Sequence, residues 1–223
     1  MGAPRRIQIG IVDVECGEGV TIVEPSNIYG CSLGDDVFIG PFVEIQEGSY
    51  IGNHTKIFSF ASVGTNPQDL KYKGEQSSLK IGNNNIFREY VTVNPGTKGG
   101  GLITKIGDNC LFMISCHVAH DCIIGNNVIL VNNASLAGHV IIDDFAIIGA
   151  LSGVHQFCRI GKHSMIGAMS GIDSDVIPYG TVVGNRAFLS GLNIIGLKRR
   201  GFNKSIIQDL KKAYGVLFVS NEG

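Results

Sequence analysis

The 223-residue sequence contains no tryptophan, and Asp, Glu, Lys and Arg together make up only 17% of it. The formal net charge of −1 excludes a broadly basic nucleic-acid-binding protein as the default interpretation, so any anion site must be local. The N-terminus lacks the long apolar run of a signal peptide, and Arg6 stands where a myristoylation motif requires Ser or Thr. We therefore expect a cytoplasmic chain with no integral membrane segment and no nucleic-acid partner.

Residues 106–183 carry a hydrophobic repeat with a period of six, which fits neither an α-helix nor a coiled coil. It fits a parallel β-helix in which three hexapeptides close one triangular coil. The first residue of each hexapeptide would fill the interior, and the fifth would have to be small or β-branched near the bend. The first positions are Ile106, Phe112, Val118, Ile124, Leu130, Leu136, Ile142, Ile148, Val154, Ile160, Ile166, Ile172 and, as the one lapse, Pro178. The fifth positions are Cys110, Cys116, Cys122, Val128, Ala134, Val140, Ala146, Ser152, Cys158, Ser164, Ser170, Val176 and Val182.

The cysteines follow this repeat. Five of the six, Cys31, Cys110, Cys116, Cys122 and Cys158, occupy fifth positions, which favours small core residues over a disulfide framework or a zinc site. Only Cys16 lies outside the pattern. Free buried thiols are typical of a reducing compartment, which agrees with a cytoplasmic protein.

Taken in order, the chain divides into one long repetitive part and a short tail. Residues 1–26 are weakly patterned, so we expect a capping or edge segment there, and regular hexapeptides begin at Leu33. Two interruptions predict loops at 65–80 and 99–105. We expect a β-helix domain over residues 1–190 and a truncated helical segment over 191–223. In that segment Asn203 would be the N-cap of a helix from Lys204 to Phe218.

Counting in coils of eighteen residues places both loops at the same corner of the prism. The hexapeptides that begin at 63, 93, 118, 136, 154 and 172 would stack there, about 4.8 Å apart. The residues gathered at this corner would be His120, Asp121, Gly138, His139 and Gln156, with Asp69 and Lys71 on the overhanging first loop. His120 could act as a general base oriented by Asp121, and the amide of Gly138 could stabilise an oxyanion.

Five motifs occur in one order between Phe60 and Phe218. They are Gln68-Asp69-Leu70-Lys71-Tyr72, His117-Val118-Ala119-His120-Asp121-Cys122, Leu136-Ala137-Gly138-His139, His155-Gln156-Phe157-Cys158, and Asn193-Ile194-Ile195-Gly196-Leu197-Lys198-Arg199-Arg200-Gly201-Phe202. On these motifs the chain resembles the UDP-N-acetylglucosamine O-acyltransferases that begin lipid A synthesis. A lone hexapeptide repeat would be a far less specific signal.

The resemblance implies an all-β fold, a left-handed parallel β-helix of hexapeptide repeats with a short C-terminal α-helical segment. It also implies a homotrimer with active sites between neighbouring subunits. His120 would remove the proton from the sugar 3-hydroxyl, Asp121 would support it, and Gly138 would supply the oxyanion amide. The implied contacts to the nucleotide sugar or the donor are Asp69, Lys71, His117, His139, His155, Gln156, Asn193, Arg199 and Arg200.

The donor implied by the resemblance is an acyl carrier protein carrying a 3-hydroxyacyl thioester, so no metal and no dissociable cofactor is expected. The position of Ala168 is the one that, in the resembling family, limits acyl-chain length.

Three features depart from the family pattern. Residues 18–56 look more like nucleotide-sugar N-acyltransferases of the same superfamily. Ile195 replaces a glutamate, and Asn94-Pro95 replaces a His-Arg pair, so the acceptor contacts differ. The sequence ends at Gly223, where the family usually has more helical sequence.

Other functions therefore stay open. A nucleotide-sugar N-acyltransferase using an acyl-CoA or acyl carrier protein donor would share the fold and a catalytic histidine, and a donor screen would distinguish it. A zinc-dependent carbonic anhydrase of the same fold could use His117, His120 and His139 as ligands, and metal analysis would distinguish it. A purely structural rod would explain neither loop.

Overall fold

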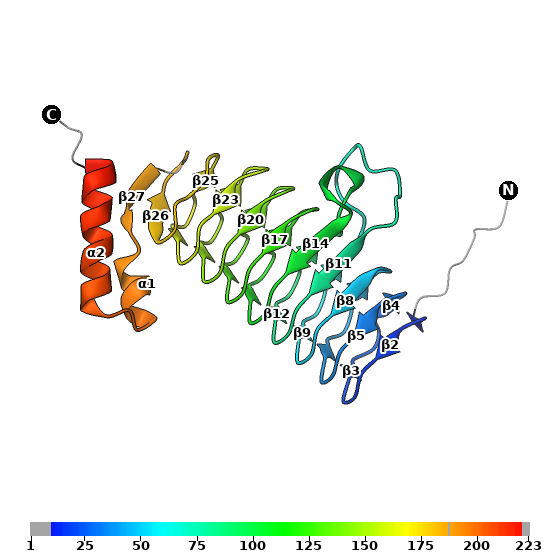
Figure 1. Cartoon of the computed structure of the whole chain (residues 1–223). Helices are drawn as coiled ribbons and strands as arrows, with labels where there is room; N and C mark the ends of the chain where they lie inside the picture. Colours follow the sequence, from blue (N-terminus) through cyan, green and yellow to red (C-terminus); the bar gives the residue numbers. More distant parts are fainter. Residues whose placement is uncertain (1–9, 187, 220–223) are drawn as a thin grey trace.

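The computed structural model describes residues 10–186 and 188–219. Over most of this range the chain winds into a left-handed parallel β-helix, and a short helical segment covers its C-terminal end (Figure 1). The fold predicted from the hexapeptide period and the family resemblance is therefore confirmed.

The coils contribute short strands to three sheets, which we call sheets 1, 2 and 3, and the strands pair in parallel except for β27, which is antiparallel to β26. Sheet 1 consists of β1 (Ile11–Val12), β4 (Asn27–Tyr29), β7 (Glu44–Ile45), β10 (Ser62–Val63), β13 (Thr92–Val93), β16 (His117–Val118), β19 (Ser135–Leu136), β22 (Gly153–Val154) and β25 (Gly171–Ile172). Sheet 2 consists of β2 (Glu15–Cys16), β5 (Ser32–Leu33), β8 (Ser49–Ile51), β11 (Ser78–Ile81), β14 (Ile103–Ile106), β17 (Ile123–Ile124), β20 (Ile141–Ile142) and β23 (Arg159–Ile160). Sheet 3 consists of β3 (Thr21–Ile22), β6 (Phe38–Ile39), β9 (Lys56–Ile57), β12 (Ile86–Phe87), β15 (Leu111–Phe112), β18 (Ile129–Leu130), β21 (Ile147–Ile148), β24 (Met165–Ile166), β26 (Gly180–Val183) and β27 (Phe188–Leu192).

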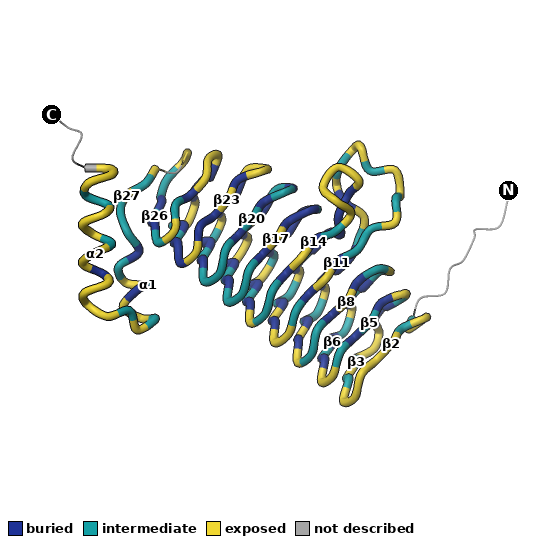
Figure 2. The backbone as a smooth tube through the Cα atoms, in the orientation of Figure 1, coloured by how far each residue is buried: buried dark blue, intermediate teal, exposed yellow. Residues whose placement is uncertain are grey.

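The interior is a continuous apolar column, as the repeat predicts. From Ile106 to Ile172 every first-position side chain is buried, and so is every fifth-position side chain from Cys110 to Val182 (Figure 2). A fully buried Ile or Leu stabilises the fold by about 1.5–3 kcal/mol, so the column is its main source of stability. Burial raises the pKa of the Cys110 and Cys116 thiols to about 11 and that of Cys122 to about 12, which keeps them protonated and unreactive.

The β-helix begins earlier than the sequence pattern indicates. Residues expected to form a capping or edge segment contain β1, β2 and β3, which pair with β4, β5 and β6 as an outermost coil. Its inward residues Val14, Val20 and Ile22 are only partly buried against the core, because within residues 10–186 this coil has a neighbouring coil on one side only. Partial burial explains why its apolar pattern is weak.

Both loops follow strands of sheet 1 and therefore leave the same corner, as predicted. The first loop spans 64–77 and the second 94–102, because β11 and β14 already begin at Ser78 and Ile103. The second loop contains a short 3-10 helix, Lys98–Gly100.

The C-terminal segment contains two elements that the hexapeptide count does not predict. Strand β27 turns back antiparallel to β26, and helix α1 (Ile194–Arg199) follows it. Helix α2 (Lys204–Tyr214) then begins after Asn203, whose side chain accepts a hydrogen bond from Ile206 N at 2.9 Å, so the predicted N-cap is confirmed. The chain continues as a π-helical turn over Gly215–Val219 rather than as α-helix to Phe218.

Candidate active site at the loop corner

The corner after sheet 1 brings the predicted residues together because the coils are stacked in register. Val118, Leu136 and Val154 are direct partners in neighbouring strands, so the residues two and three places later also stack. Among these stacked residues, His139 N donates a hydrogen bond to the carbonyl of His120 at 3.0 Å.

His120 and Asp121 form a hydrogen-bonded pair. The distance from His120 Nδ1 to Asp121 Oδ2 is 2.7 Å, and only 14% of the His120 side chain and 1% of the Asp121 side chain are exposed. A carboxylate can only accept, so Nδ1 carries the hydrogen and the lone pair lies on Nε2. This is the arrangement that a histidine general base requires.

The second loop holds Asp121. Thr97 N donates to Asp121 Oδ1 at 2.8 Å, and the Thr97 hydroxyl donates to Oδ2 at 2.6 Å. From the opposite side, Asp121 N donates to Thr104 Oγ1 at 2.8 Å. A Cβ atom at Gly100 would lie 2.0 Å from Asp121 Cγ, so this glycine lets the loop approach the carboxylate. Sequence reasoning missed Thr97, Gly100 and Thr104; the glycine-rich stretch was the only signal.

Gly138 packs directly against the imidazole. A Cβ atom at this position would lie 2.5 Å from His120 Cε1 and 2.7 Å from Nε2. Among the described residues, the Gly138 N–H has no acceptor, whereas its carbonyl accepts from Phe157 N at 3.3 Å. A free backbone N–H close to the basic nitrogen is suited to stabilise negative charge on a reacting oxygen.

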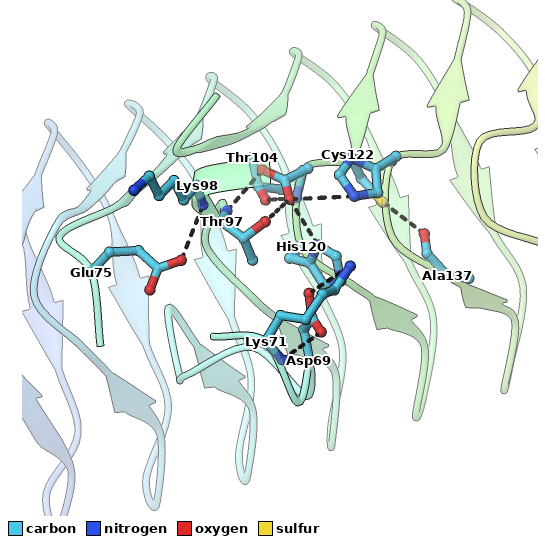
Figure 3. Close-up of polar contacts among 11 residues, drawn as sticks. Asp69, Lys71, Glu75, Thr97, Lys98, Thr104, His120, Cys122 and Ala137 are labelled. Carbon is cyan, nitrogen blue, oxygen red and sulfur yellow. Dashed lines mark hydrogen bonds and ion pairs between the residues drawn. The ribbon is translucent and has the colours of Figure 1, made fainter. Parts of the chain in front are cut away.

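The first loop places Asp69 and Lys71 beside His120 (Figure 3). Lys71 N donates to Asp69 Oδ1 at 2.9 Å, and Lys71 Nζ lies 3.7 Å from Asp69 Oδ2. The backbone hydrogen bond from Lys71 is the main reason that the pKa of Asp69 is lowered. The Lys71 side chain is 87% exposed, so its ammonium group is accessible to an anionic ligand.

The remaining predicted histidines border the same corner. His139 Nε2 lies 3.8 Å from Asp121 Oδ2, and the His139 ring stacks on Phe157 at 4.4 Å. His117 Nδ1 lies 2.7 Å from Thr92 Oγ1. Burial lowers the pKa of both histidines, and His120 lowers that of His117 further, so both favour the neutral form.

His155 and Gln156 are exposed one coil further along. His117 and His155 line a shallow groove of about 550 Å³ on the outer face of sheet 1, whose floor includes Gly153 and Gly171. The predicted site residues between Asp69 in the first loop and Gln156 therefore lie on one side of the molecule.

Asn193, Arg199 and Arg200 lie elsewhere, around a cavity of about 720 Å³ beside Ile147 and Met165 on sheet 3. Two of these side chains are used within the chain. Asn193 caps α1 through Gly196 N at 2.9 Å and donates to the His163 carbonyl at 3.0 Å.

Arg200 Nη2 donates to the Phe145 carbonyl at 2.6 Å, and the guanidinium group lies 5.5 Å from the Phe145 ring centroid. Burial lowers the pKa of Arg200. Arg199, the third predicted residue at this cavity, is exposed, and no described residue pairs with its guanidinium group.

Ala168 lies at a different corner from His120. It follows β24 of sheet 3 and is exposed, and its neighbour Met169 N donates to the Ala150 carbonyl at 2.8 Å. One copy of the chain therefore does not bring Ala168 and His120 into one pocket.

The three-histidine zinc site of the carbonic anhydrase alternative is not assembled. Within the described part of the chain, the side chains close enough to share a cation are His120, Asp121 and His139, without His117.

The Asn94-Pro95 pair, which departs from the family pattern, has a structural role. Asn94 is buried, and its amide donates to the Thr65 carbonyl at 2.9 Å, which holds the start of the first loop.

No helix among residues 10–186 and 188–219 is long and apolar enough to cross a membrane.

Comparison with known proteins identifies the family. Residues 175–223 match the family described as UDP-N-acetylglucosamine O-acyltransferase, domain 2, and residues 103–138 match the bacterial transferase hexapeptide family. The acyl-(acyl-carrier-protein)–UDP-N-acetylglucosamine O-acyltransferase of Aliarcobacter butzleri (strain RM4018) is 50% identical over 207 residues, which is 85% of this chain and 80% of the relative. The enzyme of that name from Paracoccus denitrificans (strain Pd 1222) is 58% identical over 155 residues, 70% of this chain but only 59% of the relative.

A crystal structure of a UDP-N-acetylglucosamine acyltransferase is 42% identical and superimposes with a TM-score of 0.90, covering 97% of this chain and 85% of that one. The chain thus belongs to the UDP-N-acetylglucosamine O-acyltransferase family of hexapeptide-repeat acyltransferases.

Proposed function

We propose that the chain is an acyltransferase that moves a 3-hydroxyacyl group from acyl carrier protein to the 3-hydroxyl group of a UDP-N-acetylglucosamine-type nucleotide sugar. The observation that carries this proposal is the His120–Asp121 pair, with Gly138, whose N–H has no acceptor among the described residues, packed against the imidazole ring. The relatives' names supply the substrates, and the site geometry supplies the chemistry.

In this reaction His120 Nε2 takes the proton of the sugar hydroxyl as the oxygen attacks the thioester carbonyl carbon. The carbonyl oxygen becomes negative and accepts a hydrogen bond from Gly138 N–H. When the carbon–sulfur bond breaks, His120 returns the proton to the carrier-protein sulfur, so the products are an ester and a thiol. No metal or dissociable cofactor takes part in these steps, and Asp121 stabilises the transient imidazolium.

We further propose that the active enzyme is a homotrimer. On a single chain the groove beside His117 and His155 lies on sheet 1, whereas the cavity beside Arg199 lies on sheet 3. A neighbouring copy would complete the site by bringing its Arg199 to this chain's Lys71 and His120. The same neighbour would supply the Ala168 corner that limits the acyl chain. Arg199 and Lys71 would then bind the phosphates of the nucleotide.

A cytoplasmic location is part of the proposal. Cys31, Cys110, Cys116, Cys122 and Cys158 are free and buried, which suits a reducing compartment and a carrier protein found there.

The test is a donor and acceptor screen with purified protein. UDP-N-acetylglucosamine and its 3-amino analogue are each incubated with 3-hydroxyacyl donors on acyl carrier protein or on coenzyme A, and products are separated by mass spectrometry. An ester formed from the carrier-protein donor is the expected product, and mild base cleaves it. An amide formed preferentially would establish the N-acyltransferase instead, and no transfer from either donor would refute both.

A further inference from the structure

We infer that Thr97 is a positioning residue for the catalytic pair and that Glu75 fixes Thr97 by linking the two loops; the inference rests on the proposed function. Thr97 provides two of the hydrogen bonds that Asp121 accepts, one to each carboxylate oxygen. It is 4% exposed and belongs to a loop that the hexapeptide repeat does not require.

The Thr97 hydroxyl is committed to Asp121 and not to its own loop. Thr97 is the N-cap residue of the 3-10 helix Lys98–Gly100, a position where a threonine side chain ordinarily accepts a backbone hydrogen bond. Here the side chain makes no capping bond. Its hydroxyl donates to Asp121 Oδ2, the oxygen that also accepts from His120 Nδ1 at 2.7 Å.

Glu75 ties this turn to the first loop. Its Oε1 accepts from Lys98 N at 3.1 Å, and its Oε2 accepts from Lys73 N at 2.8 Å. The backbone hydrogen bonds from Lys73 and Lys98 lower the pKa of Glu75, so it remains an acceptor near neutral pH. The contacts therefore run from Glu75 through the Lys98–Thr97 backbone to Asp121 and His120 (Figure 3).

By holding Asp121, Thr97 determines which ring nitrogen of His120 carries the hydrogen. Two bonds from one residue fix the plane of the Asp121 carboxylate, which holds His120 with its hydrogen on Nδ1. If the carboxylate rotates, a fraction of His120 takes the other tautomer, in which Nε2 is protonated and cannot act as a base. Gly100 permits this arrangement because any larger residue would push the turn away from Asp121.

The experiment compares Thr97→Val, which keeps the shape and backbone N–H but removes the hydroxyl, with Thr97→Ser, which retains it. We expect Thr97→Val to lower kcat by about ten- to a hundredfold, the range for misplacement of a catalytic group, with KM for the nucleotide sugar within about twofold. Thr97→Ser should restore most of the activity. Thr55→Val is the matched control, since Thr55 is fully buried and its hydroxyl donates to the Gly82 carbonyl, outside the site.

A second readout needs no substrate, so it distinguishes failure of this inference from failure of the proposed function. The ¹⁵N spectrum of the imidazoles, assigned with His120→Asn, should show the Nδ1–H tautomer of His120 in the wild type and in Thr97→Ser. A mixture of tautomers is expected in Thr97→Val and, more weakly, in Glu75→Ala.

An unchanged His120 spectrum in Thr97→Val would overturn the inference. So would a kcat loss no larger than that of Thr55→Val, or failure of Thr97→Ser to recover activity. An inactive wild type with the expected spectra would refute the proposed reaction but leave the positioning role standing.

Discussion

At position 138 one methyl group is enough to displace His120, the proposed catalytic base. The Cβ atom of an alanine would lie 2.5 Å from His120 Cε1, closer than packed atoms approach, so the ring must move. We expect Gly138→Ala to lower kcat at least tenfold with little change in thermal stability, and His120→Ala to lower it by about 10²-fold or more. Steady-state kinetics and thermal melts check this, and near wild-type turnover by His120→Ala would refute its role as base.

The acyl-chain limit gives a second prediction at this scale. Ala168 is exposed and carries only one methyl group. If it ends the acyl groove of the assembled enzyme, Ala168→Gly should favour longer donors and Ala168→Met shorter ones, by about 1–3 kcal/mol per misfitting methylene. Competition between carrier-protein donors of mixed length measures the shift. Identical product ratios for all three proteins would show that chain length is limited elsewhere.

Periodicity makes some site residues predictable and leaves others hidden. His120, Asp121, Gly138 and His139 could be placed because they occupy third and fourth positions of stacked hexapeptides. Thr97 lies in a loop, where no repeat fixes its distance from Asp121. A loop partner is set by tertiary contacts, which the sequence does not display.

The same limit applies to the arginines near the C-terminus. The family resemblance implies that both Arg199 and Arg200 contact the substrate, but the Arg200 guanidinium group donates a hydrogen bond to the Phe145 carbonyl. Only the folded structure shows which of these arginine side chains is already hydrogen-bonded within the chain.

Among the elements, helix α1 is attached to the β-helix through an aromatic stack around His163. The His163 ring stacks between Phe145 and Tyr179 with centroids 4.7 and 5.3 Å away, and the edge of Phe202 approaches at 5.2 Å. The His163 carbonyl accepts from Asn193, the N-cap of α1. The imidazole Nδ1 is buried and has no partner among the described residues. Protonation of His163 would therefore place a positive charge inside the contact that holds α1.

The contact between helix α1 and the β-helix should become less stable in mild acid. Burial, followed by Arg200 and Lys162, lowers the pKa of His163, and only Asp144 opposes the shift. The unfolded chain therefore binds more protons below about pH 6.5, the ordinary value for histidine. Stability is highest above that pH and falls as the pH is lowered.

Urea unfolding at pH 7.5 and 5.5 measures this effect. His163→Phe keeps an aromatic ring and should reduce the loss of stability. It should not abolish the loss, because the pKa values of His117 and His139 are lowered too. An equal loss in wild type and variant would refute the role of His163.

Apart from helix α2, whose N-cap could be recognised, elements followed from the sequence only where the repeat extended. The hexapeptide period covered the strands from β5 to β25, but the antiparallel β27 and the six-residue α1 escaped it. Both are held by contacts with the last coils, such as the hydrogen bond from Asn193 N to the Tyr179 carbonyl at 2.6 Å, rather than by their own pattern.

Across the whole molecule, the groups that we propose act on one substrate lie on separate faces. His120 and Lys71 are at the corner after sheet 1, and Arg199 borders sheet 3. A closed trimer would place the sheet 3 face of each copy against the sheet 1 corner of the next. Each complete site would then take its base from one subunit and its arginine from another.

Subunit mixing tests this arrangement. His120→Ala lacks the base, and Arg199→Glu reverses the charge of the exposed arginine, so each variant alone should have little activity. If sites form between subunits, the isolated mixed trimers should regain about a third of wild-type activity, because in each of them one site of the three combines an intact His120 with an intact Arg199. Co-expression with two affinity tags isolates the mixed assemblies, and sedimentation measures their mass. Mixed trimers with no more activity than the average of the two variants would place the whole site within one chain.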